Sequence, residues 1–186
     1  MVERLRPALA RFDQAEVALC RSLNKVGRQL LLRDLLRAVS RLGDGILWYV
    51  LLICFPLLYG SAGIWASLHM GLVALAGVAT YKFLKNRAVR ERPYITHDAI
   101  DCVGAPLDRY SFPSGHTMHA VAFTLLASHY FPEWALPLVC FGTLVALSRV
   151  ALGLHYPTDV AAGAALGGAL AAISLWATYA VSTTLL

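Results

Sequence analysis

Charged side chains are scarce in this sequence. Only 15% of its 186 residues are Asp, Glu, Lys or Arg, whereas 58% are hydrophobic. A soluble domain usually has about a quarter charged residues, so this composition excludes an ordinary soluble protein and predicts a multi-pass membrane protein. The length suits one compact domain without a second module.

Cysteine pairs and acidic metal-binding motifs are missing as well. No CxxC pair occurs among the four cysteines, which are Cys20, Cys54, Cys102 and Cys140. Their spacing indicates neither a zinc site nor a disulfide framework. Asp98, Asp101 and Asp108 match no calcium loop, so we interpret them as solvated loop residues and expect neither metal nor cofactor.

The first ten residues lack the apolar stretch and the cleavage site of a signal peptide, so we expect none. The first spanning helix would then target the chain to the membrane. The net charge of +5 is compatible with nucleic acid, but a membrane protein bordering anionic lipid carries the same sign. Membrane lipids are therefore the expected partners, and nucleic acid is not.

Residues 1–44 are predicted to form an amphipathic helical segment in the membrane interface. Between residues 28 and 42 an apolar stripe occupies one face, while Arg33, Arg37 and Arg41 recur every four residues on another. Such a helix can lie with its arginines among the lipid headgroups; a cytosolic helical extension is the alternative. The sequence LGDG at 42–45 breaks the pattern, and residues 45–186 are expected to form the transmembrane core.

Five stretches are candidates for crossing a bilayer, which takes roughly 20 apolar residues. They cover residues 46–65, 68–84, 116–131, 134–152 and 157 onward, with a link ASLH between the first two. The expected fold class is all-α, a multi-pass membrane bundle of about five transmembrane helices. Gly163 and Gly167 form a GxxxG pair in the last span, which favours either a homodimer face or close packing inside the bundle.

Chemically reactive side chains stand at helix ends on one membrane face. Because successive helices cross in opposite directions, the second and fourth spans end where the third and fifth begin. These ends hold Lys85, Arg92, Ser114, His116, Arg149, His155 and Asp159. Their convergence predicts a single site at this face.

The residue types at these ends favour an oxyanion. Ser114 is a good N-cap residue, Gly115 lets backbone N–H groups approach a ligand, and Pro157 suits a first helical position. Helix N-termini bind anions, and an arginine inside an apolar helix, as at Arg149, is usually functional. Two helix N-termini, three cations and two histidines therefore predict a site for a tetrahedral oxyanion, phosphate above all.

Other polar residues near helix ends have ordinary interpretations. Arg87 and Arg90 are read as headgroup anchors, and His119, one turn after His116, borders the predicted site without an assigned role. Three histidines are interpreted as structural hydrogen-bonding residues: His69, His97 and His129.

The three segments resemble the signature motifs of the type 2 phosphatidic acid phosphatase family, which is related to the soluble vanadium haloperoxidases. The family pattern is KxxxxxxRP, PSGH and SRxxxxxHxxxD. It is filled here by residues 85–93, 113–116 and 148–159, in the family's order. The five apolar spans disfavour the haloperoxidase branch. Many members have six spans, and in this chain the amphipathic segment stands in place of the first.

The resemblance implies a role for each signature residue. His155 would attack phosphorus and form a phosphohistidine, while Asp159 holds the other ring nitrogen and His116 protonates the leaving oxygen and then activates water. The phosphoryl oxygens would be bound by Lys85, Arg92, Ser114, Gly115 and Arg149. No metal is implied, because fixed cations would supply the positive charge.

The expected function is a metal-independent membrane phosphatase that removes a terminal phosphate or diphosphate from a lipid. The candidate substrates are polyprenyl (di)phosphates, phosphatidate, phosphatidylglycerol phosphate and lipid-linked sugar phosphates, and the sequence does not choose among them. Two alternatives are a lipid phosphotransferase and a non-enzymatic transporter or scaffold of the same fold.

The charge distribution predicts which side of a bacterial inner membrane the site faces. All 16 Lys and Arg residues fall on the side of the predicted site or at helix ends beside it. Short segments rich in Lys and Arg stay in the cytoplasm. This predicts a cytoplasm-facing site, with the periplasmic face, where many bacterial members of the family act, as the alternative.

Overall fold

The computed structural model describes residues 2–27, 29–106 and 108–184, with side chains from residue 10 onward. Its elements are α1 (Val2–Gly27), α2 (Leu30–Arg41), the π-helical turn η1 (Leu42–Ile46), α3 (Leu47–Arg87), α4 (Pro93–Thr96), α5 (Gly115–Tyr130), η2 (Pro132–Trp134), α6 (Ala135–Ala151) and α7 (Pro157–Thr184). The β-pairing in this part of the chain is limited to one isolated bridge, between Glu91 and Tyr110. The all-α expectation is confirmed.

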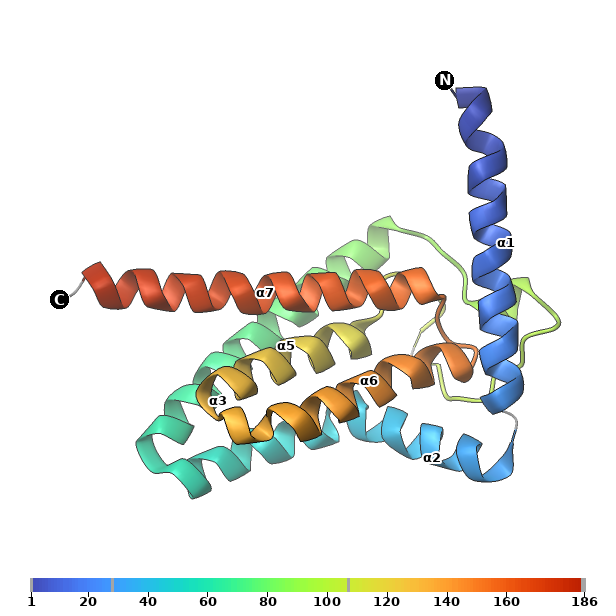
Figure 1. Ribbon diagram of the computed structural model, residues 1–186. Helices are drawn as coiled ribbons and strands as arrows, with labels where there is room; N and C mark the ends of the chain where they lie inside the picture. The colour runs from blue at the N-terminus through green and yellow to red at the C-terminus, as the bar shows by residue number, and fades with distance from the viewer. Residues whose placement is uncertain (1, 28, 107, 185–186) are drawn as a thin grey trace.

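The long helices form a bundle around α5, which contacts α3, α6 and α7 (Figure 1). Among the described residues, three segments are long and apolar enough to cross a membrane, namely residues 30–87, 132–151 and 157–184. Helix α5 has 16 residues, about 24 Å of helix. It is the inner helix of the bundle, and several of its side chains are fully buried. The chain is a multi-pass membrane protein, as predicted.

Small residues let α7 approach α5 closely. A Cβ atom on Gly163 would lie 2.4 Å from the Ser114 carbonyl oxygen, and one on Gly167 would lie 2.2 Å from that of Met118. Any larger residue at either position would force the two helices apart. The GxxxG pair therefore packs against α5 inside the bundle, which agrees with the second of the two interpretations, close packing within one chain. A homodimer stays a prediction, and this glycine face cannot supply it because α5 covers it.

The turn between the first two spans was predicted wrongly. The link ASLH at 66–69 lies within helix, and the chain reverses at Gly60, whose φ of 57° and ψ of −129° interrupt α3. This left-handed region favours glycine. After the turn, Gly63 lies so close to the Phe55 carbonyl that a Cβ would sit 2.0 Å from its oxygen. Helix α3 is thus a hairpin of two arms, residues 47–59 and 61–87.

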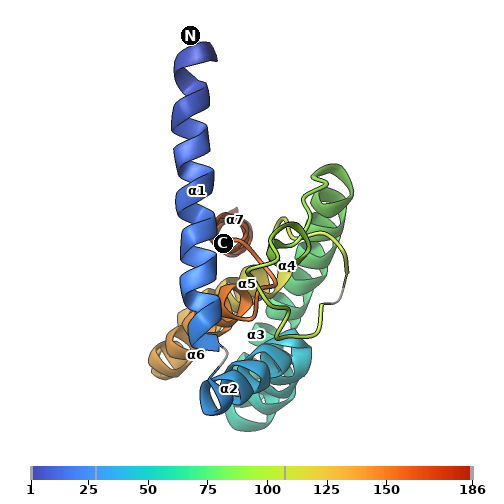
Figure 2. The same cartoon turned by 90° about the vertical axis from the view of Figure 1, so that its right-hand side faces the viewer.

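The N-terminal helices take two directions. Helix α1 crosses the end of the bundle, upright in both views, whereas α7 runs along the bundle axis (Figures 1 and 2). Helix α2 leads through η1 directly into α3. The placement of residues 1–44 in the membrane interface stays a prediction. The predicted break at 42–45 is a kink in a continuing helix. Arg28, the first residue of the predicted amphipathic helix, lies outside the described residues.

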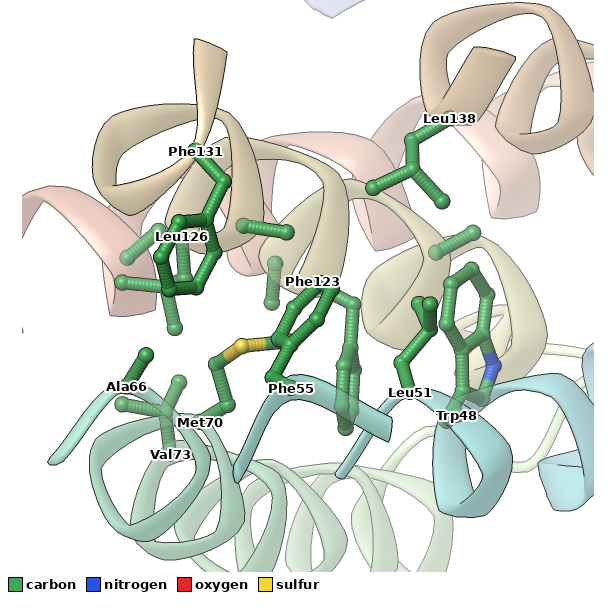
Figure 3. Close-up of a cluster of buried hydrophobic side chains, with 14 of the residues drawn as sticks. Trp48, Leu51, Phe55, Ala66, Met70, Val73, Phe123, Leu126, Phe131 and Leu138 are labelled. Carbon is green, nitrogen blue, oxygen red and sulfur yellow. The ribbon is translucent and has the colours of Figure 1, made fainter. Parts of the chain in front are cut away.

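Aromatic packing holds the first arm of α3 against α5 and α6 (Figure 3). Trp48 stacks on Phe123 with ring centroids 5.0 Å apart, and Phe55 meets Phe131 edge-on at 4.9 Å. Such pairs contribute about 0.5–1.5 kcal/mol each beyond the area they bury. The core fixes the position of the residues that precede α3, including η1.

Candidate active site

The predicted site residues meet at one end of the bundle, where α3 and α6 end and α5 and α7 begin (Figure 1). Two backbone contacts join the loops that carry them. Ser111 N donates to the Arg90 carbonyl at 2.8 Å, and Ser114 N donates to the Asp159 carbonyl at 3.0 Å. The three segments singled out in the sequence are therefore neighbours in the fold.

His155 and Asp159 lie together in the interior. His155 Nδ1 is 3.7 Å from Asp159 Oδ2, and both side chains are almost completely buried. Asp159 Oδ2 also accepts a hydrogen bond from Tyr156 N at 2.8 Å. In the described part of the chain His155 Nδ1 has no hydrogen-bond partner. A small movement of the carboxylate would let Nδ1–H donate to it, which leaves the nucleophilic lone pair on Nε2.

The environment of His155 keeps its imidazole neutral. Burial, followed by the positive charges of Arg149 and Arg92, lowers the pKa of His155 well below its ordinary value. The Nε2 atom lies 3.3 Å from Arg92 Nη1. A neutral imidazole has the lone pair that a nucleophile needs, so the surrounding cations serve both to bind an anion and to keep His155 reactive.

Arg92 and Lys85 both donate hydrogen bonds to the carboxylate of Asp108, which was predicted to be a solvated loop residue. Asp108 Oδ1 accepts from Arg92 Nη2 at 2.9 Å, and Asp108 Oδ2 accepts from Lys85 Nζ at 2.6 Å. Burial alone would raise the pKa of Asp108, but the hydrogen bonds and charges of Lys85 and Arg92 outweigh it and lower that pKa. Asp108 lies in the loop with its side chain 39% exposed, as the solvated-loop interpretation held, but it also pairs with two cations. Its carboxylate sits on two of the predicted phosphate-binding cations.

Arg149 is held inside the bundle. Its side chain is almost wholly buried, and Nη1 donates to Ser40 Oγ at 2.5 Å. Within the described residues its Nε has no partner. Buried guanidinium N–H groups are normally satisfied, so an anion in the adjacent cavity would complete the hydrogen bonding of Arg149.

At the start of α5 the predicted residues divide into two groups. Ser114 caps the helix by accepting from Thr117 N at 3.4 Å, as expected of an N-cap residue, and its buried side chain is not part of the cavity wall. Gly115 and His116 line the cavity. His116 Nε2 lies 3.0 Å from Asp44 Oδ1, a carboxylate contributed by η1. Sequence reasoning missed Asp44 because it stands far from the three motifs.

The interpretation of Arg90 also needs correction. Arg90 was interpreted as a headgroup anchor, but its Nη1 donates to Asp159 Oδ1 at 2.8 Å and its Nη2 donates to Glu16 Oε2 at 2.6 Å. The guanidinium also stacks over the Tyr156 ring, 3.9 Å from its centroid. Glu16 Oε1 in turn accepts from Thr158 N at 2.9 Å, in the first turn of α7. Through Glu16 and Arg90, helix α1 is therefore connected by hydrogen bonds to Asp159, the carboxylate beside His155.

Of the three histidines predicted to form structural hydrogen bonds, His69 is confirmed in that role. His69 Nδ1 bonds the Tyr130 hydroxyl at 2.8 Å, far from the site, and His97 and His129 make edge contacts with tyrosine rings. His119 joins two helices, through the Gly115 carbonyl at 2.9 Å and the Ala74 carbonyl at 3.3 Å, and borders the cavity. Its position agrees with the border location considered from the sequence.

The site opens into a cavity of about 680 Å³ with two chemically different ends. The polar end is formed by Lys85, Arg92, Asp108, Gly115, His116, Arg149 and His155, with Asp44 beside them. The apolar end includes Trp48, Leu52, Leu68, Leu72, Leu75 and Phe123. Leu68, Leu72 and Leu75 are each more than half exposed, so this wall opens towards the lipid side of the bundle. The shape suits an amphiphile with an anionic head.

Fold and site together define a polytopic membrane protein with a buried histidine–carboxylate pair beside a pocket lined by cations. The sequence profile of the PAP2 superfamily matches residues 66–182, which include all three motifs. The chain belongs to the PAP2 superfamily.

Individual relatives agree with this assignment. The chain is 34% identical over 142 residues to the decaprenylphosphoryl-5-phosphoribose phosphatase of Mycobacterium tuberculosis (strain ATCC 25618 / H37Rv), covering 74% of this chain and 75% of that protein. It is 32% identical over 93 residues to undecaprenyl-diphosphatase BcrC of Bacillus subtilis, covering 50% of this chain and 48% of the relative. The chain therefore spans about half the length of that second relative.

A solved structure has the same fold. The crystal structure of a PAP2-type phosphatidylglycerolphosphate phosphatase from Bacillus subtilis superposes with a TM-score of 0.75 at 25% sequence identity. The match covers 92% of this chain and 88% of that one. The likeness thus extends beyond the three motifs to most of the bundle.

Proposed function

We propose that this protein hydrolyses the terminal phosphate or diphosphate of a membrane lipid. The observation that carries the proposal is the two-ended cavity, in which cations and histidines occupy one end and apolar side chains the other. A lipid phosphate would place its headgroup among Lys85, Arg92 and Arg149 and its chain along the two arms of α3. The relatives described above, whose names denote phosphatases of lipid phosphates, support this substrate class.

The chemistry proceeds in two displacement steps. In the first, the His155 Nε2 lone pair forms a bond to phosphorus while the bond to the leaving oxygen breaks, and His116 supplies the proton that this oxygen takes up. In the second, His116 removes a proton from water, the water oxygen bonds phosphorus, and the phosphorus–nitrogen bond breaks. Asp159 stabilises the positive charge that develops on His155.

Charge on the phosphoryl group is neutralised by fixed side chains in this mechanism. Lys85, Arg92 and Arg149 take the place that metal ions take in many phosphoryl-transfer sites, and Gly115 lines the same cavity. We expect full activity in EDTA, and inhibition by vanadate, which adopts the trigonal bipyramidal geometry of the displacement. A strict requirement for added magnesium would overturn metal independence.

The decisive experiment is phosphate release by the purified protein from a panel of lipid phosphates. The panel contains polyprenyl monophosphate and diphosphate, phosphatidate, phosphatidylglycerol phosphate and a lipid-linked sugar phosphate. Each assay is run with and without a candidate acceptor alcohol. Release of inorganic phosphate to water supports the hydrolase. Transfer to the acceptor favours a phosphotransferase, and no turnover of any lipid favours a transporter or scaffold.

We further propose that the site faces the cytoplasm. The far end of the bundle is formed by the turn between the two arms of α3, by η2 and by the C-terminal end of α7 (Figure 1), and it has no Lys or Arg. Cys102 is exposed on the loop before α5, at the site's end. A variant that keeps only this cysteine should react with an impermeant maleimide after permeabilisation alone. Because partial desolvation of the thiol raises the pKa of Cys102, labelling is best run at mildly alkaline pH. Labelling of intact cells would show a periplasmic site.

A further inference from the structure

The turn η1 has an unusual backbone directly beside the site. Residues 42–46 form a kinked turn between α2 and α3, in which Gly45 has a non-helical φ of 133° and ψ of −36°. A residue with a Cβ atom would be strained at this φ. The sequence thus places a glycine where the helix must kink.

Contacts on both sides hold this turn in place. A Cβ on Gly43 would lie 2.8 Å from Val145 Cγ2, so Gly43 allows η1 to pack directly on α6. Trp48 Nε1 donates to the Gly43 carbonyl at 3.0 Å, and the same indole stacks on Phe123 of α5. The kinked turn is therefore packed against two helices of the core.

The side chain that this turn presents to the cavity is Asp44. Its Oδ1 lies 3.0 Å from Nε2 of His116, whose side chain is 9% exposed, while that of Asp44 is 39% exposed. The surrounding pocket gathers three cations, which oppose a positive charge on His116. Asp44 supplies a negative charge in direct contact with the ring and fixes which ring nitrogen carries hydrogen.

We propose that Asp44 is a positioning residue for His116. It accepts a hydrogen bond from Nε2–H, holds the ring orientation and stabilises the imidazolium, so that Nδ1 exchanges the proton with the leaving oxygen and later with water. Asp44 itself stays ionised throughout. The inference rests on the proposed function, since it assigns Asp44 to the acid–base step of that reaction. Asp44 lies outside residues 66–182, the segment that matches the superfamily profile.

The test compares leaving groups. Protonation matters most for a poor leaving group, so Asp44→Asn should lower kcat for a lipid monophosphate about tenfold to hundredfold, with KM changed less than about threefold. Turnover of p-nitrophenyl phosphate, whose leaving group needs little protonation, should fall less than about threefold. Asp44→Glu should recover part of the lost kcat. Asp34→Asn is the matched control, because Asp34 is 65% exposed and pairs with Arg33 and Arg37 on α2.

Two outcomes would overturn the assignment. One is an unchanged kcat for the monophosphate in Asp44→Asn; the other is an equal loss for both substrates, as expected if the variant only disturbs the fold. A second readout needs no turnover: ¹⁵N NMR of His116 should show hydrogen on Nε2 in the wild type and a mixture of tautomers in Asp44→Asn. If the wild-type protein releases no phosphate, the proposed function is refuted. The tautomer measurement does not depend on turnover, so it still tests whether Asp44 fixes the tautomer of His116.

Discussion

His155 Nδ1 lies 3.7 Å from Asp159 Oδ2, and the second carboxylate oxygen of Asp159 is bonded to Arg90. This arrangement orients a buried imidazole with its Nε2 atom towards Arg92 and the cavity.

Replacing His155 should abolish catalysis without unfolding the protein. If His155 is the nucleophile, His155→Ala loses the covalent route, and kcat should fall at least about 1,000-fold, roughly 4 kcal/mol of barrier. Asp159→Asn should lower kcat by about 10²–10⁴, because the amide cannot stabilise the imidazolium. His129→Ala, an exposed histidine near the other end of α5, is the control. A loss of only about tenfold in His155→Ala would exclude the nucleophile role.

His155 should remain neutral at mildly acidic pH. Burial and the neighbouring arginines lower its folded-state pKa, so ¹⁵N NMR of the free protein should show a neutral ring at pH 6, with His155→Gln used for assignment. The unfolded chain takes up this proton near pH 6.5, so lowering the pH through that value favours unfolding at this site. Wild type should therefore lose more thermal stability between pH 7 and pH 5 than His155→Gln. A ring that is half protonated near pH 6.5 would contradict the expectation.

Removing the charge of Asp108 should tighten anion binding. Asp108 occupies hydrogen-bonding positions on Lys85 and Arg92 that a phosphate would need, so substrate and carboxylate compete. Asp108→Asn should lower the inhibition constant of vanadate about tenfold, about 1.4 kcal/mol. Asp98→Asn, an exposed residue of the same loop, should have no effect. Weaker vanadate binding in Asp108→Asn would instead mean that Asp108 orients the two cations for their ligand.

Arg90 should affect kcat through Asp159. Arg90→Ala removes the hydrogen bonds to Asp159 and Glu16 and should lower kcat about tenfold to hundredfold. Arg90→Lys keeps the charge but not the two-pronged geometry, so its kcat should be intermediate. Arg87→Ala is the matched control, since Arg87 is an exposed arginine close by in the sequence. If Arg90→Ala and Arg87→Ala behave alike, Arg90 is the headgroup anchor that its position in the sequence suggested.

Much of the architecture was readable from the sequence, because the physical signals are local. Long apolar stretches must satisfy their backbone hydrogen bonds as helices in a membrane, and α5, α6 and α7 appear close to their predicted positions. The cap of α5 was also predictable, because a serine side chain can accept a hydrogen bond from the first turn of the helix that follows it, as Ser114 does. The three motifs had to meet at one end of the bundle, because antiparallel neighbours alternate direction.

Contacts between distant segments were decided by the tertiary structure alone. Asp44, Asp108 and Glu16 are ordinary surface carboxylates in the sequence, and only the packing of η1, the 97–113 loop and α1 brings each one against a cation or histidine. The reversal at Gly60 was equally hidden, because the apolar composition is nearly even through α3 and does not mark one glycine as the turn. Local patterns therefore determined the helices and the order of the motifs. The partners of the buried charges depend on sub-ångström packing between elements far apart in the chain, and the sequence carries no local signal for that.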